Sequence, residues 1–168
     1  MKIHLRVALF FALVILIVPL ANAQAIVTRG VSIGGGLKVD IHAPQSTKPK
    51  GLFRPGRKAP VLLYVHGGGW VRGTRAKIYK LDQFATSRDW MLVSTDYRPV
   101  PRTSIDGQVR DVARAINWVR KNIKRYGGDP KKIVIMGHSA GSHLVSLVAA
   151  KKSGRPSARR DCQRCSGL

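Results

Sequence analysis

The segment GHSAG, residues 137–141, places a serine between two glycines in the pattern G-x-S-x-G. It lies between two apolar runs, KIVIM before it and HLVSLVAA after it. In this context Gly137 and Gly141 permit a sharp turn from a strand into a helix, which exposes the serine hydroxyl. The pattern therefore predicts Ser139 as a nucleophile. The alternative is a tight turn that contains a serine without using it.

A second glycine-rich segment, HGGGW at residues 66–70, directly follows the apolar run VLLYV. Glycine lets a ligand approach the backbone closely. Attack of a serine on a carbonyl carbon places negative charge on the carbonyl oxygen, and each prepositioned N–H donor stabilises that charge by about 3 kcal/mol. We predict that the amides of Gly68, Gly69 and Ala140 are these donors.

Three histidines lie close to these motifs in the sequence, and each is an alternative general base. His138 directly precedes the serine and should point away from it. His143 lies one helical turn after Ser139. We expect His66, together with Gly67, to hold the shape of the glycine loop by hydrogen bonding.

Runs of alternating or continuous apolar residues predict strands, and apolar residues at spacings of three and four predict helices. Strands are expected at 31–33, 36–44, 61–65, 90–97 and 132–136, and helices at 77–88, 105–123 and 142–150. Strands that alternate with helices are typical of an α/β fold with a mostly parallel sheet. The apolar stripe of the long helix comprises Ile105, Val109, Val112, Ile116, Val119 and Ile123.

The chain has 30 Lys and Arg against 8 acidic residues, a formal net charge of +22 over 168 residues. Such an excess favours anionic partners, a surface or a polymer. A basic stripe on the long helix comprises Arg110, Arg114, Lys121 and Arg125. No aromatic residues interleave with this stripe, so we expect a solvated face and find no specific nucleic-acid motif.

The chain begins with two basic residues, an apolar run and the small-residue site Ala21-Asn22-Ala23. This pattern predicts a signal peptide at 1–23 and a secreted or periplasmic protein, with no stable membrane span after cleavage. An uncleaved anchor is the alternative. Residues 24–150 then form a partial domain, and 151–168 a basic tail expected to be disordered. Its cysteines, Cys162 and Cys165, are half of a zinc site at best, so no metal is expected.

The motifs occur in longer stretches: LKVDIHAP, VLLYVHGGGWVRG, VSTDYRP and DVARAINWVRKNIKRYGGDPKKIVIMGHSAGSHL. From Leu37 to Ala150 the sequence resembles the α/β-hydrolase fold, and within it the esterases and lipases with an HGGG motif, near the hormone-sensitive-lipase-like and feruloyl-esterase-like carboxylesterases. The resemblance implies hydrolysis of small-molecule carboxylic esters, or less often amides, through an acyl-enzyme without metal or organic cofactor.

The sequence also departs from that family, in which an acid and then a histidine follow the serine on later loops. After Ser139 the only acid is Asp161 and the only histidine is His143. We therefore expect that the acid and histidine partners are absent from this chain, that it is the N-terminal half of the domain, and that it is weakly active or inactive. By the family's strand order, residues 132–136 would then form an open edge, exposing Ile133, Val134 and Ile135.

Two other interpretations remain open. The chain is a non-catalytic binding protein that holds anionic polymers on an incomplete hydrolase scaffold, or a second polypeptide completes the sheet and supplies the missing acid and histidine.

Overall fold

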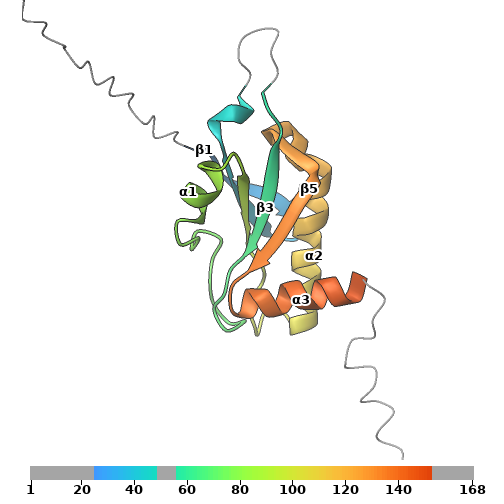
Figure 1. The fold of residues 1–168 in the computed structure, drawn as a ribbon. Coiled ribbons are helices and arrows are strands. Elements are labelled where there is room, and N and C mark those ends of the chain that lie inside the picture. Colours follow the sequence, from blue (N-terminus) through green and yellow to red (C-terminus); the bar gives the residue numbers. More distant parts are fainter. Residues whose placement is uncertain (1–24, 49–55, 153–168) are drawn as a thin grey trace, which may run out of the picture.

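The computed structural model describes residues 25–48 and 56–152 (Figure 1). The described strands are β1 (Ile26–Gly34), β2 (Leu37–Ala43), β3 (Ala59–Val65), β4 (Met91–Thr95) and β5 (Gly128–Gly137). The helices are α1 (Leu81–Thr86), α2 (Ile105–Asn122) and α3 (Ala140–Lys152), with short 3-10 turns η1 (Gln45–Thr47) and η2 (Ile123–Tyr126). The predicted signal peptide at 1–23 lies outside the described residues. So does the tail predicted at 151–168, except for Lys151 and Lys152, which continue α3, so the expected disorder is wrong for these two residues.

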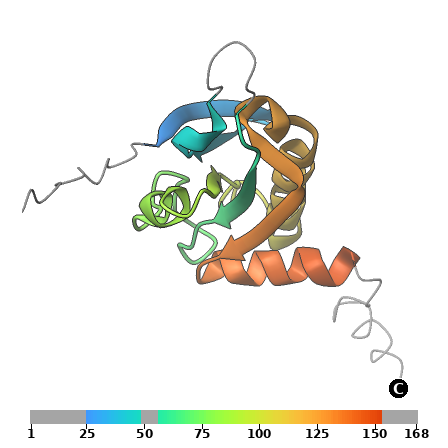
Figure 2. The same ribbon diagram turned by 45° about the horizontal axis from the view of Figure 1, so that its top comes forward.

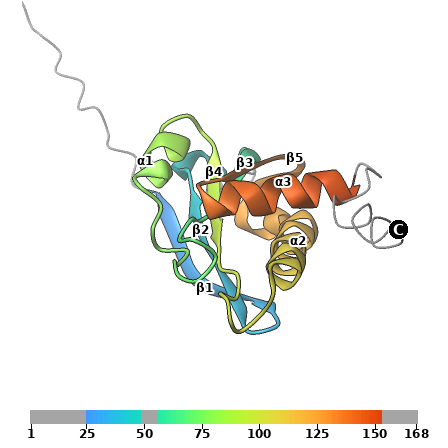
Figure 3. The ribbon, with the colours of Figure 1, turned by 90° about the horizontal axis from the view of Figure 1, so that it is seen from below.

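The described strands form one sheet in the order β1-β2-β4-β3-β5. β3 pairs in parallel with both β4 and β5, whereas β2 pairs antiparallel with both β1 and β4. Helices α1 and α2 lie on opposite sides of this sheet, as the view along the strands shows (Figure 3). The α/β fold class is confirmed, with the parallel pairing concentrated in the part of the sheet that leads to Ser139.

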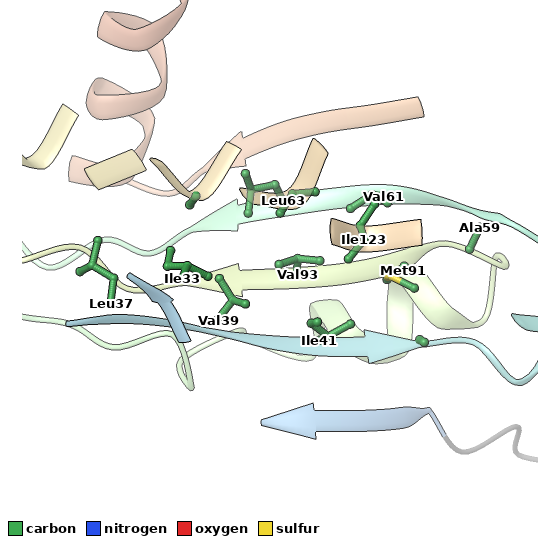
Figure 4. Close-up of a cluster of buried hydrophobic side chains, with 13 residues drawn as sticks. Ile33, Leu37, Val39, Ile41, Ala59, Val61, Leu63, Met91, Val93 and Ile123 are labelled. Atoms are coloured by element: carbon green, nitrogen blue, oxygen red, sulfur yellow. The ribbon is translucent and has the colours of Figure 1, made fainter. Parts of the chain in front are cut away.

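Both faces of β3 are buried, which explains its continuous apolar sequence. Val61 and Leu63 belong to the cluster that packs against α2 (Figure 4), whereas Leu62 and Tyr64 pack on the side of α1. Alternation of side chains along a strand separates the two sets. Burying each such side chain stabilises the fold by about 1.5–3 kcal/mol.

Helix α2 forms as its apolar spacing predicts. Ser104 caps its first turn, accepting a hydrogen bond from the amide of Gly107 at 3.2 Å. Val112 and Val119 are fully buried, while the arginines and lysine of the basic stripe are exposed. Helix α3 crosses beside α2 (Figure 2), and its Leu144 joins Val109 and Val112 in a second buried cluster. Helix α2 therefore packs against both the sheet and α3, the helix that follows Ser139.

Helix α1 is shorter than the predicted helix at 77–88. Tyr79 and Lys80 have φ values of 49° and 61°, and a right-handed helix cannot pass through that conformation. Its regular part therefore begins only at Leu81.

Strand β2 contains buried polar residues, because Asp40 and His42 are as buried as the apolar residues between which they alternate. The polar face of an alternating strand is commonly solvated, but here α1 and the segment around residue 75 cover it.

Among the described strands, β5 pairs only with β3, so it forms one edge of the sheet. Val134 is 49% exposed and Met136 is 40% exposed on one face of this strand. Ile133 and Ile135 are half-buried on the other face, where Ile133 packs against the main core. The expected exposure of residues 133–135 is thus correct for Val134 and wrong for the two isoleucines, because α2 covers their side.

Candidate active site

Ser139 lies on the turn between β5 and α3, with a left-handed φ of 52° and an exposed side chain. Two glycines make this turn possible. A Cβ at Gly137 would fall 2.4 Å from the backbone carbon of Gly141, and one at Gly141 would fall 2.2 Å from the carbonyl oxygen of Val65. No side chain fits at either glycine, so strand and helix approach as closely as backbone contact allows.

The glycine loop lies directly against this turn. The amide of His138 donates to the carbonyl oxygen of Val65 at 3.1 Å, which joins the ends of β5 and β3. A Cβ at Gly67 would fall 3.1 Å from the Cβ of Ser139. Two motifs that are more than seventy residues apart in the sequence therefore meet at the carboxyl ends of two adjacent parallel strands.

Gly68 and Gly69 have φ values of 129° and 62°, a conformation that favours glycine. The carbonyl oxygen of Gly68 accepts from the amides of Val71 and Arg72, at 3.3 and 3.1 Å, which closes the loop into a turn. A Cβ at Gly69 would meet no atom within 4 Å, so its backbone faces open space.

Ala140 is the first residue of α3, where amides have no partner within the helix and the helix dipole is positive. Within residues 25–48 and 56–152, the amides of Gly68, Gly69 and Ala140 donate to no protein acceptor. These three amides therefore have no protein partner in the described residues, and their role as oxyanion donors stays a prediction.

His66 is buried and interacts within its own loop. Its Nδ1 lies 2.8 Å from the carbonyl oxygen of Gly67, and its ring stacks on that of Tyr97 with centroids 4.3 Å apart. The hydroxyl of Tyr97 donates to the carbonyl oxygen of His66 at 3.2 Å. Burial lowers the pKa of His66, although the hydrogen bond to Gly67 acts in the opposite direction. A neutral His66 therefore shapes the loop rather than facing a substrate.

The other two histidines contact aromatic rings. The ring of His138 lies 5.5 Å from that of Tyr79, and the ring of His143 meets Trp70 edge-on at 5.6 Å. Among the described residues, the Ser139 hydroxyl has no hydrogen-bonding partner, from these histidines or from any carboxylate. The described part of the chain thus brings a candidate nucleophile close to candidate oxyanion donors, and within it no histidine or carboxylate side chain bonds the Ser139 hydroxyl.

Sequence reasoning missed the ion pairs that hold the segment after the glycine loop. The guanidinium of Arg75 bonds Asp40 on β2 at 2.8 Å and Asp96 after β4 at 2.5 Å. The Ser94 hydroxyl donates to the carbonyl oxygen of Arg75. Burial raises the pKa of Asp40, but hydrogen bonds from the Gly30 amide and Arg75 outweigh it, so the net pKa is lowered. A carboxylate within an apolar strand was the available signal for this network.

A second missed contact joins the loop to helix α2. The carbonyl oxygen of Trp70 accepts from Gln108 Nε2 at 2.7 Å and from the Val100 amide at 2.9 Å. Gln108 is fully buried. A glutamine directly beside the apolar stripe of α2 is the signal that would have indicated an inward polar contact.

The described residues contain no group of three or more His, Cys, Asp or Glu side chains placed to hold a metal ion. In the same residues, no helix combines the length and the apolar character that crossing a membrane requires.

A sheet flanked by helices, with a serine on a strand-to-helix turn beside a glycine loop, defines an α/β-hydrolase. Residues 39–163 match the model of the BD-FAE family, and the chain belongs to this family. The resemblance of the sequence to α/β-hydrolase carboxylesterases is thereby confirmed.

Several curated relatives are esterases. Esterase LipQ of Mycobacterium tuberculosis is 48% identical over 96 residues, which cover 56% of this chain and 23% of LipQ. A probable isoprenylcysteine alpha-carbonyl methylesterase of Arabidopsis thaliana is 34% identical over 125 residues, which cover 74% of this chain and 24% of that protein. The chain thus spans about a quarter of the length of these relatives.

Solved structures agree on the fold. A thermostable esterase from Pseudomonas putida superimposes with a TM-score of 0.63 at 26% identity, over 81% of this chain and 42% of that one. Esterase B from Lactobacillus rhamnosis, inhibited and 23% identical, has a TM-score of 0.67 over the same shares and supports the fold alone.

Proposed function

We propose that this chain carries the nucleophile and the oxyanion hole of a carboxylic ester hydrolase acting on small-molecule esters. The observation that carries the proposal is the contact between the turn at Ser139 and the glycine loop, where a Cβ at Gly67 would lie 3.1 Å from that of Ser139. The esterase relatives support the same reaction class.

In this mechanism the Ser139 Oγ forms a bond to the acyl carbon, and the carbonyl π electrons move onto the oxygen. The amides of Gly68, Gly69 and Ala140 donate to that oxyanion. Its collapse expels the alcohol, which takes the proton that Ser139 released to a base. Water then attacks the acyl-enzyme by the same route and releases the carboxylic acid. No step uses a metal or an organic cofactor.

The chain alone is expected to be weakly active or inactive. The three histidines near the motifs, His66, His138 and His143, contact Tyr97, Tyr79 and Trp70 instead of the Ser139 hydroxyl. Loss of the histidine from a serine triad costs about 10⁶ in turnover. We propose that the acid and the histidine that activate Ser139 come from outside the described residues.

An added base tests this arrangement. The full chain is incubated with a fluorophosphonate, with and without imidazole, and the phosphonylated protein is measured by mass spectrometry. Imidazole accepts the proton as Oγ bonds phosphorus and fluoride leaves. It should increase labelling of Ser139 by roughly tenfold, part of the about 10²–10⁴ that a positioned base supplies.

The Ser139→Ala variant should lose the adduct, and Ser146→Ala, an exposed serine two turns along α3, should keep it. Imidazole-dependent labelling that is spread over other residues, or that survives in Ser139→Ala, would show that Ser139 is not the nucleophile.

Charge favours a second candidate function, the binding of an anionic polymer without catalysis. The cations of the basic stripe, three on α2 and Arg125 in η2, are all exposed. Retention on heparin in physiological salt, together with no labelling of Ser139 even with imidazole, would favour this function over hydrolysis.

We also propose that residues 1–23 act as a signal peptide and that the protein is exported. Expression in a bacterial host, followed by mass spectrometry of the periplasmic fraction, should give a chain that begins at Gln24. A full-length chain in the membrane fraction would support an uncleaved anchor instead.

A further inference from the structure

A cavity lies at the end of the sheet opposite to Ser139. It is lined by residues at the ends of β1 and β2, by η1, and by the residues before β3 and β5, and its volume is about 470 Å³. Small-molecule sites commonly have volumes of roughly 300–1,000 Å³. The ten-residue strand β5 runs from this cavity to the turn at Ser139, a distance of roughly 30 Å. The cavity is therefore separate from the candidate active site.

Backbone contacts between distant segments build the wall of this cavity. The Ala59 amide donates to the carbonyl oxygen of Gly127 at 2.9 Å, and the Arg57 amide donates to that of Ser46 at 2.9 Å. A Cβ at Gly127 would fall 2.6 Å from the Cβ of Thr47, so η1 packs tightly against the residues before β5. The cavity thus exists without a ligand to order it.

The lining is apolar inside and cationic at its rim. Ile41 and Ala43 are buried lining residues, and Ile26 and Tyr126 add further apolar surface. Four exposed cations from three segments complete the lining: Lys48, Lys58, Lys124 and Arg125. The described residues that line the cavity include no carboxylate.

Most of the described carboxylates pair with residues that do not line the cavity. All eight acidic residues of the chain are aspartates, and six of the seven described ones form ion pairs: Asp40 and Asp96 with Arg75, Asp111 with Arg98, Asp89 with Arg57, Asp106 with Lys151, and Asp82 with His42. In the part of the chain that the structure describes, the four rim cations have no carboxylate within ion-pair distance.

Arg125, the last cation of the basic stripe, lies beside aromatic rings, so the expectation that no aromatic residues accompany this stripe is wrong for Arg125. Its guanidinium carbon lies 5.2 Å from the ring centre of Tyr126 and 5.7 Å from that of Trp118. A guanidinium presents a planar fork of N–H groups, which match the two oxygens of a carboxylate. An apolar interior below such a rim suits a ligand with an apolar body and one carboxylate.

We propose that this cavity binds an organic monocarboxylate, either aliphatic or aromatic, with the carboxylate at the rim and the apolar body against Ile26 and Tyr126. The site is independent of the proposed hydrolysis at Ser139. The ligand needs both features for selective binding. A carboxylate alone would bind any exposed cation, and an apolar body alone would make no interaction with the cations at the rim.

NMR titration of the full chain in physiological salt tests the proposal, with hexanoate and benzoate as probes. Saturable shifts at the amides of Thr47 and Gly127 are expected. Hexanamide, which lacks the charge, and acetate and inorganic phosphate, which lack the apolar body, should bind at least about tenfold more weakly. Equal binding of phosphate or acetate would indicate diffuse charge attraction and overturn the proposal, and equal binding of hexanamide would overturn the role of the rim.

Charge-removing variants provide the second arm. Lys58→Gln and Arg125→Gln should each weaken hexanoate binding by about fivefold. Lys121→Gln is the matched control, because Lys121 is an exposed cation of α2 that does not line the cavity. A comparable loss in Lys121→Gln, with circular dichroism showing all variants folded, would overturn the assignment of the site.

Discussion

Glycine 141 decides how closely helix α3 approaches the end of strand β3. A Cβ there would meet the carbonyl oxygens of Val65 and His66 at 2.2 and 2.6 Å. Both are backbone atoms of a buried strand end, so neither can move without displacing the sheet. The absence of a side chain at Gly141 therefore both allows the close packing of α3 on β3, which stabilises the fold, and sets the position of Ser139.

We expect Gly141→Ala to lower the free energy of unfolding by about 3 kcal/mol, the upper end of the usual cost of overpacking. Urea denaturation measures it. Gly36→Ala is the control, since a Cβ at Gly36 meets nothing within 4 Å and only its left-handed φ opposes alanine, at about 1 kcal/mol. An equal cost for the two variants would mean that contact with β3 is not what excludes a side chain at position 141.

At the scale of residues, the sequence predicted local structure best where a motif is compatible with only one backbone conformation. Glycines around Ser139 and after β3 indicated the turn and the loop, and the structure brings the two together. The ion pairs of Arg75 with Asp40 and Asp96 were not predictable, because they join residues from three separate segments. Only the folded sheet places those segments side by side.

At the scale of elements, periodicity predicted α2 closely and α1 poorly. The long helix has an apolar stripe over eighteen residues and a serine cap. Many residues, each with a weak preference, therefore favour the same helix. Helix α1 has six residues, and the conformations of Tyr79 and Lys80 set its start. Those conformations follow from the path of the preceding loop, which local sequence does not encode.

The two edges of the described sheet differ in how they resist association. β1 is interrupted by register shifts between Thr28 and Val31 and between Ser32 and Gly34, which distort its free edge. β5 pairs regularly with β3 from Ile133 to Gly137 and exposes Val134. A regular apolar edge is the kind that pairs with another strand.

We therefore expect the chain to self-associate through β5, and Val134→Lys to shift it toward monomer in sedimentation velocity experiments, by about fivefold or more in the association constant. Val27→Lys makes the same change at a 42% exposed valine of β1 and should leave association unchanged. Association that responds to the β1 variant, or to neither, would contradict this assignment of the edge.

At the scale of the whole molecule, the α/β fold could be predicted because the order of strands and helices restricts the topology. The antiparallel pairing of β2 with β4 could not, since it depends on which edge of the parallel strands the first hairpin joins. The burial of Asp40 and His42 follows from that choice, because it places β2 inside the sheet.

Buried titratable groups should make global stability depend on pH. Burial lowers the pKa of His42, partly opposed by Asp82, and it lowers that of His66, both from a usual 6.5. The unfolded chain then binds more protons than the folded one, so stability is full above pH 6.5 and is lost as pH falls toward the folded pKa values. The lowered pKa of Asp40 adds a further loss below its usual 3.8.

Urea unfolding across acidic pH should show this decline in two stages. His66→Gln should flatten the upper stage, whereas His143→Gln, a change at an exposed position on α3, should not. A free energy of unfolding that rises on acidification through pH 6.5 would contradict the expected direction.

The carbonyl oxygen of Trp70 receives hydrogen bonds from both Gln108 and Val100, while Arg75 fastens the following residues to the sheet. The glycine segment between β3 and these attachments lacks regular secondary structure but is held at both ends. Its conformational entropy is lost when the chain folds, not when an ester arrives. Under the proposed function, the amides of this segment would therefore be in place before a substrate binds.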